Sequence, residues 1–323
     1  MQSDPLQAIE ILSQQFGNQL QHQVRLSNLS TAHVGGLASW LVTVENLKEL
    51  SEAVQVCWDH KLHFFLLGSG SNILFSDSGF NGLIILNRAK EIQVNNTEEN
   101  PTIAAWSGAN LGMVARQAAI AGLSGLEWAA TIPGTIGGAV YGNAGAHGSD
   151  MNSNLLLAEI LQQDIGIIVW KNNDFQFSYR SSILKRQPEK RIILSATLKC
   201  EYDEPEKIKE RMNAYSEHRR RTQPPGASMG SMFKNPPGDF AGRLIEAAGL
   251  KGYSIGGVKV SEKHANFFVN NDQATSKDIY ELVQHVEKTV KEKFGVHLEL
   301  EVEMVGFNQM SNNTIAFQRK ASI

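Results

Sequence analysis

Cysteine is scarce in this sequence, where Cys57 and Cys200 are the only two among 323 residues. Two cysteines are too few for a disulfide framework, and these two lack the spacing of metal ligands. Both lie in apolar segments, so we expect buried free thiols. The candidate histidine ligands for a metal are His33, His147, His218 and His264. They form no spaced set, so we expect no metal site.

Long apolar runs and an excess of one charge are absent as well. No run approaches the roughly 18 residues of a membrane span, and residues 1–5 lack the basic region and apolar stretch of a signal peptide. Lys and Arg number 30 against 33 Asp and Glu, a net charge of −3, which argues against a general nucleic-acid binder. We expect a cytoplasmic, monomeric protein that contacts neither membranes nor nucleic acids.

What the sequence does contain is typical of a globular protein with real cores. Hydrophobic residues make up 42% of the chain and charged residues 20%, which excludes a disordered chain. Length alone suggests about two domains. Glycine is the unusual count, with 28 residues against 9 prolines, and six of the glycines fall between residues 134 and 148.

Helical and extended patterns alternate along the chain, which indicates mixed α and β content. Asn46 can begin a helix with Glu49 as its capping-box partner, and Thr275 begins the clearest amphipathic helix. Asp239 can cap a helix over 240–248. The other predicted helices cover 5–22, 111–121 and 205–221, and the predicted strands cover 63–67, 73–75, 82–86, 103–106, 155–170 and 192–201.

The segment 296–304 alternates strictly, which predicts a strand. Its apolar face carries Leu298, Leu300, Val302 and Met304, and its polar face carries Glu299, Glu301 and Glu303. Three carboxylates on one polar face are ordinarily a solvated surface, and the periodicity cannot choose among them.

Two glycine-rich stretches are candidate ligand loops. Residues 68–72, Gly-Ser-Gly-Ser-Asn, follow a predicted buried strand, and their backbone N–H groups could converge on an anion. The stretch lacks a Walker A lysine and the third glycine of a dinucleotide fingerprint, so a phosphate nest and a plain tight turn both remain open. Residues 132–145 interleave glycine with apolar residues. Close approach to a ligand and tight internal packing would each explain that pattern.

Two further loops carry polar side chains suited to catalysis. Ser231 is flanked by glycine and followed by Lys234 and Asn235, so it could donate a proton or bind an oxyanion. Arg180 stands beside aromatic residues and could clamp a carboxylate or phosphate. An ordinary loop serine and a solvated arginine are the plainer interpretations. The arginines at 219–221 are equally typical of an exposed helix end.

Taken together and in order, these motifs resemble the UDP-N-acetylenolpyruvoylglucosamine reductase (MurB) family of peptidoglycan synthesis. The resemblance runs from about residue 25 to 307. It rests on residues 68–72, 132–145, Tyr179-Arg180-x-Ser182, 230–236, Ser261-Glu262-Lys263-His264-Ala265-Asn266-Phe267 and Leu298-x-x-Glu301-Val302. The absence of a tyrosine-bearing insertion after Arg180 is typical of the shorter, type II subclass.

The resemblance implies an α+β fold in which a two-part FAD-binding unit of the vanillyl-alcohol-oxidase type is joined to a C-terminal α+β substrate-binding domain. The boundaries that we expect are an N-terminal helix over 1–24, FAD-binding subdomains over 25–90 and 91–204, a substrate-binding domain over 205–307 and a loose tail over 308–323. The estimate of two domains from length thereby rises to three.

The resemblance also implies a reaction and its participants. NADPH would pass a hydride to FAD, and the hydride would then reach the methylene carbon of the enolpyruvyl group of UDP-N-acetylglucosamine enolpyruvate, giving UDP-N-acetylmuramate. Ser231 would protonate the α carbon, while Arg180 and Glu301 would polarise the substrate carboxylate. Two carboxylates meet favourably only if one is protonated, so we expect the pKa of Glu301 to be raised.

The family pattern assigns the remaining site residues. Substrate would contact Tyr179, Lys234, Asn235 and Arg221. FAD would contact Gly68, Ser69, Gly70, Ser71, Asn72, Ile132, Pro133, Gly134, Thr135, Gly137, Gly138 and Ala139. The chain departs from the pattern at Ala32-His33-Val34, where an aromatic and a basic residue usually stand, and at Gly142, where a larger residue is common.

Two other functions compete with this hypothesis. A different FAD-dependent oxidoreductase could use the same scaffold, and a non-catalytic protein could merely bind flavin or a nucleotide sugar. Retention of Arg180, Ser231 and Glu301 together argues against both alternatives.

Overall fold

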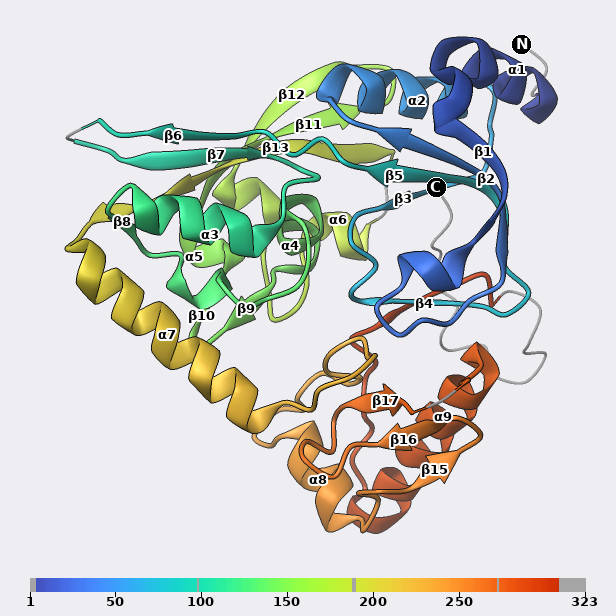
Figure 1. The fold of residues 1–323 in the computed structure, drawn as a ribbon, viewed down its shortest axis with the longest axis vertical. Helices are drawn as coiled ribbons and strands as arrows, with labels where there is room; N and C mark the ends of the chain where they lie inside the picture. Colours follow the sequence, from blue (N-terminus) through green and yellow to red (C-terminus); the bar gives the residue numbers. More distant parts are fainter. Residues whose placement is uncertain (1–3, 98, 188–189, 272, 308–323) are drawn as a thin grey trace.

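The computed structural model describes residues 4–97, 99–187, 190–271 and 273–307. Figure 1 shows three parts: a blue-to-cyan part, a green part and an orange-to-red part, with one long yellow helix running from the second part to the third. Sheets and helices occur in all three parts, which agrees with the expected α+β class. The predicted tail over 308–323 lies outside the described residues.

The first part is built on a four-stranded sheet with the order β1-β2-β5-β3. Its strands are β1 (Leu20–Arg25), β2 (Leu37–Val44), β5 (Phe80–Asn87) and β3 (Phe64–Leu67). Strands β2, β5 and β3 are parallel, and β1 is antiparallel to β2. Helices α1 (Pro5–Phe16) and α2 (Leu47–Asp59) cover one face of this sheet.

The helix predicted over 5–22 is wrong at its C-terminal end. It stops at Phe16 because Gly17 adopts a positive φ of 49°, a conformation that ends helices and that glycine adopts without strain. Leu20 then begins β1, whose partner β2 no local pattern could identify. The predicted capping of α2 is confirmed, since the Asn46 side chain accepts a hydrogen bond from the Glu49 N–H at 2.9 Å.

The second part is an antiparallel five-stranded sheet with the order β12-β11-β13-β7-β6. Its strands are β6 (Ile92–Asn95), β7 (Thr102–Trp106), β11 (Leu155–Gln162), β12 (Gly166–Lys171) and β13 (Arg191–Lys199). The helices beside it are α3 (Leu111–Ile120), α4 (Ile136–Gly142), α5 (Met151–Asn154) and α6 (Ile183–Arg186). Short paired strands complete it: β8 (Leu123–Ser124) with β14 (Glu201–Tyr202), and β9 (Gly145–Ala146) with β10 (Ser149–Asp150).

Helices α3 and α4 lie on the same side of this sheet (Figure 1) and share its core. Helix α4 occupies the middle of the glycine-dense stretch. The Thr135 hydroxyl caps its first turn, and Asn143 ends it in the left-handed conformation. The stretch therefore forms a short, capped helix rather than an open loop. Cys57 belongs to the core of the first part and Cys200 to that of the second, and both thiols are buried and free, as predicted.

The third part packs helices α8 (Ala241–Ala247) and α9 (Ser276–Phe294) around a small antiparallel sheet. Its strands are β15 (Ser254–Ile255), β16 (Val258–Val260) and β17 (Phe268–Asn270). The predicted start of α9 is confirmed, because Thr275 and Asp278 form a capping box. The predicted cap at Asp239 is wrong. Phe240 precedes α8, and the Asn235 side chain accepts the hydrogen bond from the Ala241 N–H.

The strand predicted over 296–304 is much shorter than its alternating pattern suggests. Only β18 (Glu303–Val305) pairs in a regular ladder, parallel to β4 (Ile73–Phe75) of the first part. Leu298 and Val302 are buried as predicted. The preceding residues are extended and contact the Ser231 loop instead, through a bridge between Leu300 and Phe233. The alternating pattern correctly predicted the burial of Leu298 and Val302. It could not predict which distant residues the segment pairs with.

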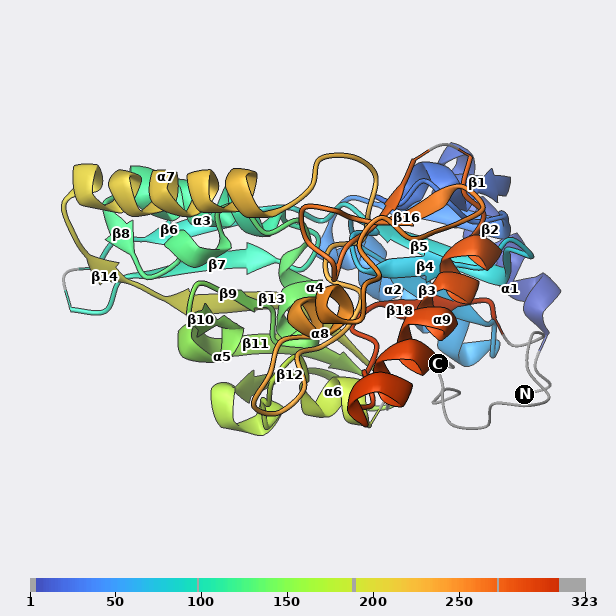
Figure 2. The ribbon, with the colours of Figure 1, turned by 90° about the horizontal axis from the view of Figure 1, so that it is seen from below.

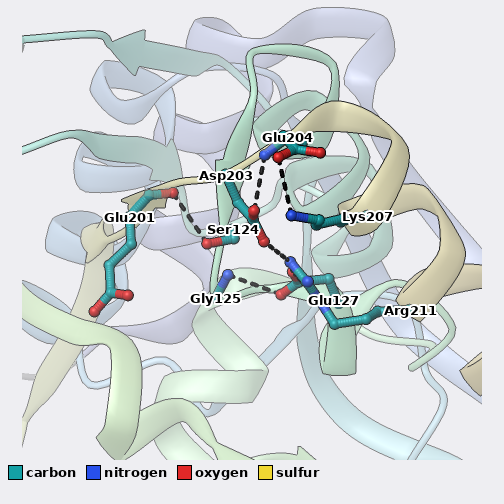
Figure 3. Close-up of polar contacts among 8 residues, drawn as sticks. All are labelled: Ser124, Gly125, Glu127, Glu201, Asp203, Glu204, Lys207 and Arg211. Carbon is teal, nitrogen blue, oxygen red and sulfur yellow. Dashed lines mark hydrogen bonds and ion pairs between the residues drawn. The ribbon is translucent and has the colours of Figure 1, made fainter.

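Helix α7 (Pro205–Thr222) links the second part to the third, and Figure 2 shows it lying along the outside of the second part. Ile208 is its buried residue. Arg211 forms ion pairs with Glu127 at 2.7 Å and with Asp203 at 2.6 Å, and Figure 3 shows the three side chains converging. In the described part of the chain, no helix combines the length and apolar character that a membrane crossing needs.

Candidate active site

The two glycine-rich stretches, far apart in the sequence, touch each other. The loop 68–72 joins β3 to β4, and the Ser71 hydroxyl donates a hydrogen bond to the Pro133 carbonyl oxygen at 3.1 Å. A Cβ atom on Gly68 would lie 2.5 Å from the Thr135 hydroxyl oxygen. The predicted flavin residues of both stretches are thus parts of one surface between the first and second parts.

The glycines of this surface serve two different purposes. At Gly68, Gly70 and Gly137, a Cβ atom would meet protein atoms within 3.0 Å, so internal packing requires these glycines. At Gly134 and Gly138, the nearest atom to a Cβ would be 3.7 Å away. These two positions leave backbone uncovered by protein, which suits close approach by a planar ligand. Tight internal packing therefore explains some of these glycines, and close approach to a ligand stays a prediction for Gly134 and Gly138.

The segment that departs from the family pattern adjoins this surface. The Thr31 N–H donates a hydrogen bond to the Gly70 carbonyl oxygen at 3.1 Å. Ala32 and Val34 are buried within the core of the third part, and the Asn270 side chain donates to the Ala32 carbonyl oxygen at 2.9 Å. Residues 32–34 therefore connect the first glycine-rich loop to the third part.

Arg180 and Glu301 form an ion pair, with 2.8 Å between the arginine Nε and the glutamate Oε1. Their side chains are 25% and 19% exposed. Arg180 lies in a tight turn closed by two backbone hydrogen bonds between Ser178 and Ser181, and its φ is 54°. A non-glycine residue in this conformation costs on the order of 1 kcal/mol and is typical of functional sites.

The environment of Glu301 favours its neutral form. Burial raises the pKa of this carboxyl group, although Arg180, Lys185 and Lys234 partly offset the effect. The direction confirms the expectation from the sequence. Desolvation disfavours the charged form of a carboxyl group, and nearby cations favour it. Glu301 is consequently a half-buried acid whose charge state depends on its neighbours.

Ser231 lies on a loop that is held directly against Glu301. The carbonyl oxygen of the next residue, Met232, accepts a hydrogen bond from the Glu301 N–H at 2.9 Å. Asn266 supports this loop through its side chain, which bonds both the N–H and the carbonyl oxygen of Phe233. Gly230, at φ 77°, lets the chain turn just before the serine.

The loop 68–72 also reaches Glu301. The Asn72 side chain donates a hydrogen bond to the Glu301 carbonyl oxygen at 3.0 Å, and the Asn72 carbonyl oxygen accepts one from the Glu303 N–H at 3.0 Å. The structure thereby brings together the first glycine-rich loop, the serine loop and the Arg180–Glu301 pair.

A cavity of about 640 Å³ opens beside the two glycine-rich stretches and the serine loop, and Arg180, Ser231 and Glu301 are not among the residues that line it. Ser71 and Pro133 line it from the flavin loops, Gly230 from the serine loop, and Arg219 and Arg220 from the end of α7. Burial lowers the pKa of Arg219 from its usual range. The cavity is thus positively charged on one side and bordered by glycine-rich backbone on the other, as suits a large anionic ligand.

The predicted substrate residues are partly assembled here. The Tyr179 hydroxyl lies 3.5 Å from the Asn235 N–H, and Lys234 forms an ion pair with Glu299 at 2.5 Å. The Asn235 side chain is used to cap α8. Arg221 is exposed and does not line the cavity, whereas its neighbours at 219 and 220 do.

The sequence interpretation missed one ion pair near the site. Lys185 on α6 lies 3.0 Å from Glu303, and both side chains are about a quarter exposed or less. No local pattern could have identified this pair, because its members belong to different parts of the molecule and are separated by more than a hundred residues. The expectation of a solvated glutamate face holds for Glu299, whose side chain is 67% exposed, and is wrong for Glu301 and Glu303, which are mostly buried and paired with cations.

Comparison with known proteins shows which family this chain resembles over most of its length. The family profile described as "UDP-N-acetylenolpyruvoylglucosamine reductase, C-terminal domain" matches residues 222–305, and the profile described as "FAD binding domain" matches residues 38–170. A UDP-N-acetylenolpyruvoylglucosamine reductase from Caldicellulosiruptor saccharolyticus is 44% identical over 284 residues, covering 87% of this chain and 90% of that protein. The Bacillus subtilis protein of the same name is 41% identical over 287 residues, covering 88% and 93%.

A solved structure gives the same result. The crystal structure of UDP-N-acetylenolpyruvylglucosamine reductase from Thermus caldophilus matches with a TM-score of 0.74 and 36% sequence identity. The match covers 88% of this chain and 98% of that one. The similarity therefore extends over all three parts of the fold.

Proposed function

This chain belongs to the UDP-N-acetylenolpyruvoylglucosamine reductase family, and we propose that Arg180, Ser231 and Glu301 carry out its chemistry. The protein is an FAD-dependent oxidoreductase of peptidoglycan synthesis. The observation that carries the assignment of residues is the meeting of the Arg180–Glu301 ion pair with the serine loop beside a cavity lined by both flavin loops.

The residues present fit FAD. The uncovered backbone at Gly134 and Gly138 leaves room for a planar or phosphate group, and the loop 68–72 lies against the same stretch. We assign FAD binding to 68–72 and 132–139. When bound there, FAD would supply the chemistry of hydride transfer between NADPH and the methylene carbon of the enolpyruvyl group.

Arg180 and Glu301 act on the substrate carboxylate. Addition of a hydride to the methylene carbon leaves negative charge on the α carbon and on its carboxylate. An arginine that is three-quarters buried stabilises such charge strongly, because little water screens it. Glu301 contributes as a neutral acid that donates a hydrogen bond to the carboxylate, a role that its raised pKa supports.

Ser231 delivers a proton to the α carbon. A serine hydroxyl is a weak acid, and it gives up a proton only to a strongly basic atom such as an enolate-like carbon. The hydrogen bond from Glu301 to the adjacent Met232 fixes the serine loop beside the charged pair. Proton donation by a positioned side chain typically contributes roughly 100- to 10,000-fold to a rate.

The substrate's other groups are assigned to Tyr179, Lys234, Asn235 and Arg221. Arg219 and Arg220 add positive charge where the cavity meets α7, so the diphosphate belongs at that side. The division at 25, 91 and 205 into two flavin-binding parts and a substrate-binding part is retained in this proposal. A monomer located in the cytoplasm, where nucleotide-linked substrates and NADPH would be available, completes it.

The proposal is tested by following the absorbance of bound FAD without oxygen. The purified protein is expected to be yellow, to lose its visible absorbance when NADPH is added, and to regain it with UDP-N-acetylglucosamine enolpyruvate. If an unrelated oxidant restores the visible absorbance and the enolpyruvyl compound does not, the protein is a different flavin oxidoreductase.

A further inference from the structure

The two glutamates at 301 and 303 are held against one short segment of the second part. Glu301 pairs with Arg180 at 2.8 Å, and Glu303 pairs with Lys185 at 3.0 Å. The cations lie five residues apart around α6 and the turn before it, and the carboxylates lie two residues apart at the start of β18. The two ion pairs are therefore neighbours in the sequence on both sides. The two cations lie on one short segment, and the two carboxylates lie on another.

The second ion pair, Lys185–Glu303, is mostly buried rather than exposed on the surface. The side chains of Lys185 and Glu303 are 21% and 24% exposed. The Lys185 Nζ also lies 5.9 Å from the centre of the Tyr141 ring on α4, and the Glu303 N–H donates to Asn72 of the first glycine-rich loop. The reaction assigned above uses neither side chain.

We propose that Lys185 and Glu303 are positioning residues that set the charge state of Glu301 toward the substrate carboxylate. The proposal rests on the function assigned to Glu301 above. Lys185 favours the ionised form of Glu301, and Glu303 favours its neutral form. The balance between these two influences then sets how readily Glu301 takes up the proton that it needs to meet a second carboxylate.

Every charged group that faces Glu301 belongs to this balance. Arg180, Lys185 and Lys234 act on it from the second and third parts and lower its pKa. Glu299 and Glu303 lie two residues to either side of Glu301 on its own segment, and Glu299 forms an ion pair with Lys234 at 2.5 Å. Tyr141 stays neutral, because burial and the charge of Glu303 raise its pKa well above physiological pH. Lys185 is the cation of this set that is paired to Glu303.

The proposal predicts opposite effects from two variants that break the same ion pair. Lys185→Met removes a cation and leaves Glu303 as an unpaired carboxylate, so the pKa of Glu301 rises. Glu303→Gln removes the carboxylate and leaves Lys185 unpaired, so the pKa of Glu301 falls. A full charge at close range moves a half-buried carboxyl group by about one pH unit. A purely structural pair would give changes in the same direction.

Two measurements read out the charge state. Infrared difference spectra of protein carrying ¹³C-labelled glutamate follow the carboxyl band of Glu301 during a pH titration, and the band is assigned by its loss in Glu301→Gln. This readout needs no substrate. The rate at which substrate restores FAD absorbance is then measured against pH. Neutral Glu301 is the active form, so this rate declines as pH rises through its pKa.

The expected results form a matched set. Lys185→Met shifts both midpoints upward by about one pH unit, Glu303→Gln shifts them downward by a similar amount, and the double variant returns close to the wild type. Lys251→Met, which breaks an ion pair with Glu246 elsewhere in the third part, leaves both midpoints unchanged. Thermal unfolding and FAD content identify any variant that has lost its fold, in which case Lys185→Gln replaces Lys185→Met.

Two outcomes separate this inference from the function on which it rests. If the infrared midpoint of Glu301 shifts in the same direction in both variants, or does not shift in either, the proposed role of the Lys185–Glu303 pair is overturned. Opposite infrared shifts with a pH profile that does not follow them would support the pair's control of Glu301 and would reject the catalytic role assigned to Glu301 itself.

Discussion

The backbone N–H of Glu301 donates a hydrogen bond of 2.9 Å to the carbonyl oxygen of Met232. Through this one bond, the loop that carries Ser231 is fixed to the segment that carries the acid paired with Arg180. The proposed proton donor and the proposed carboxylate-binding acid thus lie on different stretches of the chain. A backbone hydrogen bond joins these two stretches directly. Chemistry that needs all three residues at once depends on this connection.

Replacing Ser231 should separate the two halves of the reaction. In Ser231→Ala, we expect NADPH to reduce FAD at nearly the wild-type rate, whereas reoxidation by the enolpyruvyl substrate falls roughly 100-fold or more. Stopped-flow absorbance measures both steps. Ser228→Ala is the matched control, because Ser228 lies three residues before Ser231 and lines the cavity beside the serine loop. Equal losses in the two half-reactions would contradict the role of Ser231 as the proton donor.

Replacing Arg180 should weaken the stabilisation of charge on the substrate carboxylate. Loss of such a contact costs roughly 3 kcal/mol of barrier, about a 100-fold decrease in the reoxidation rate. We expect this decrease in the reoxidation rate for Arg180→Met and a smaller decrease for Arg180→Lys. Arg186→Met serves as the control, since Arg186 is an exposed arginine of the same segment that bonds the Gln176 carbonyl oxygen. A reoxidation rate in Arg180→Met no lower than in the control would rule the assignment out.

The Arg211 network should stabilise the attachment of α7. The Glu127 side chain is 9% exposed and bonds Arg211 and the Gly125 N–H, so Arg211→Met leaves a buried carboxylate without its cation (Figure 3). Because Arg211 is 39% exposed and water screens part of its charge, we expect a loss of about 2 kcal/mol in unfolding free energy. Urea denaturation measures this loss.

A second variant tests the cause of that loss. Adding Glu127→Gln to Arg211→Met should recover part of the stability, because the unpaired charge is then gone. Lys207→Met, which removes an exposed ion pair with Glu204 on the same helix, should change the unfolding free energy by less than about 0.5 kcal/mol. A double variant that is less stable than Arg211→Met would show that packing, not charge, holds the helix.

Glu287 on α9 should make stability depend on pH. Burial raises its pKa to about 7 from an ordinary 4.5. Between these values the folded protein holds a proton that the unfolded chain has released, so stability declines as pH rises through this window. Glu287→Gln should therefore stabilise the protein by about 2 kcal/mol at pH 8 and change little at pH 4. Glu292→Gln, an exposed position on the same helix, should show no such pH dependence.

The local elements were largely predictable from the sequence. Asn46 and Thr275 cap their helices as predicted, because a cap is formed by residues three positions apart. The strand before Gly68 and the turn after it were likewise evident from a short apolar run followed by small polar residues. Errors arose where a distant partner overrode a local pattern, as at Leu20, which continues a helical spacing but pairs with Val42.

The candidate residues themselves were also available from the sequence, but through the order of several motifs rather than through any one of them. Periodicity alone left Glu299, Glu301 and Glu303 equivalent. In the structure they differ because each meets a different cation: Lys234, Arg180 and Lys185 respectively. Arg180 and Lys185 belong to one short segment and Lys234 to another, both far from the glutamates in the sequence, so no spacing rule relates these cations to the glutamates.

By itself, then, the sequence determined which short segments are helical, extended or glycine-rich, since these properties depend on residues a few positions apart. Only the tertiary structure decided that Gly68 and Gly137 are required by packing, whereas a Cβ atom on Gly138 would come no closer than 3.7 Å to its nearest neighbour. It also decided that Glu301 is buried beside Arg180 and tied to Met232. Burial and charge balance arise when separate cores pack together, and they are properties of that assembly rather than of any stretch of chain.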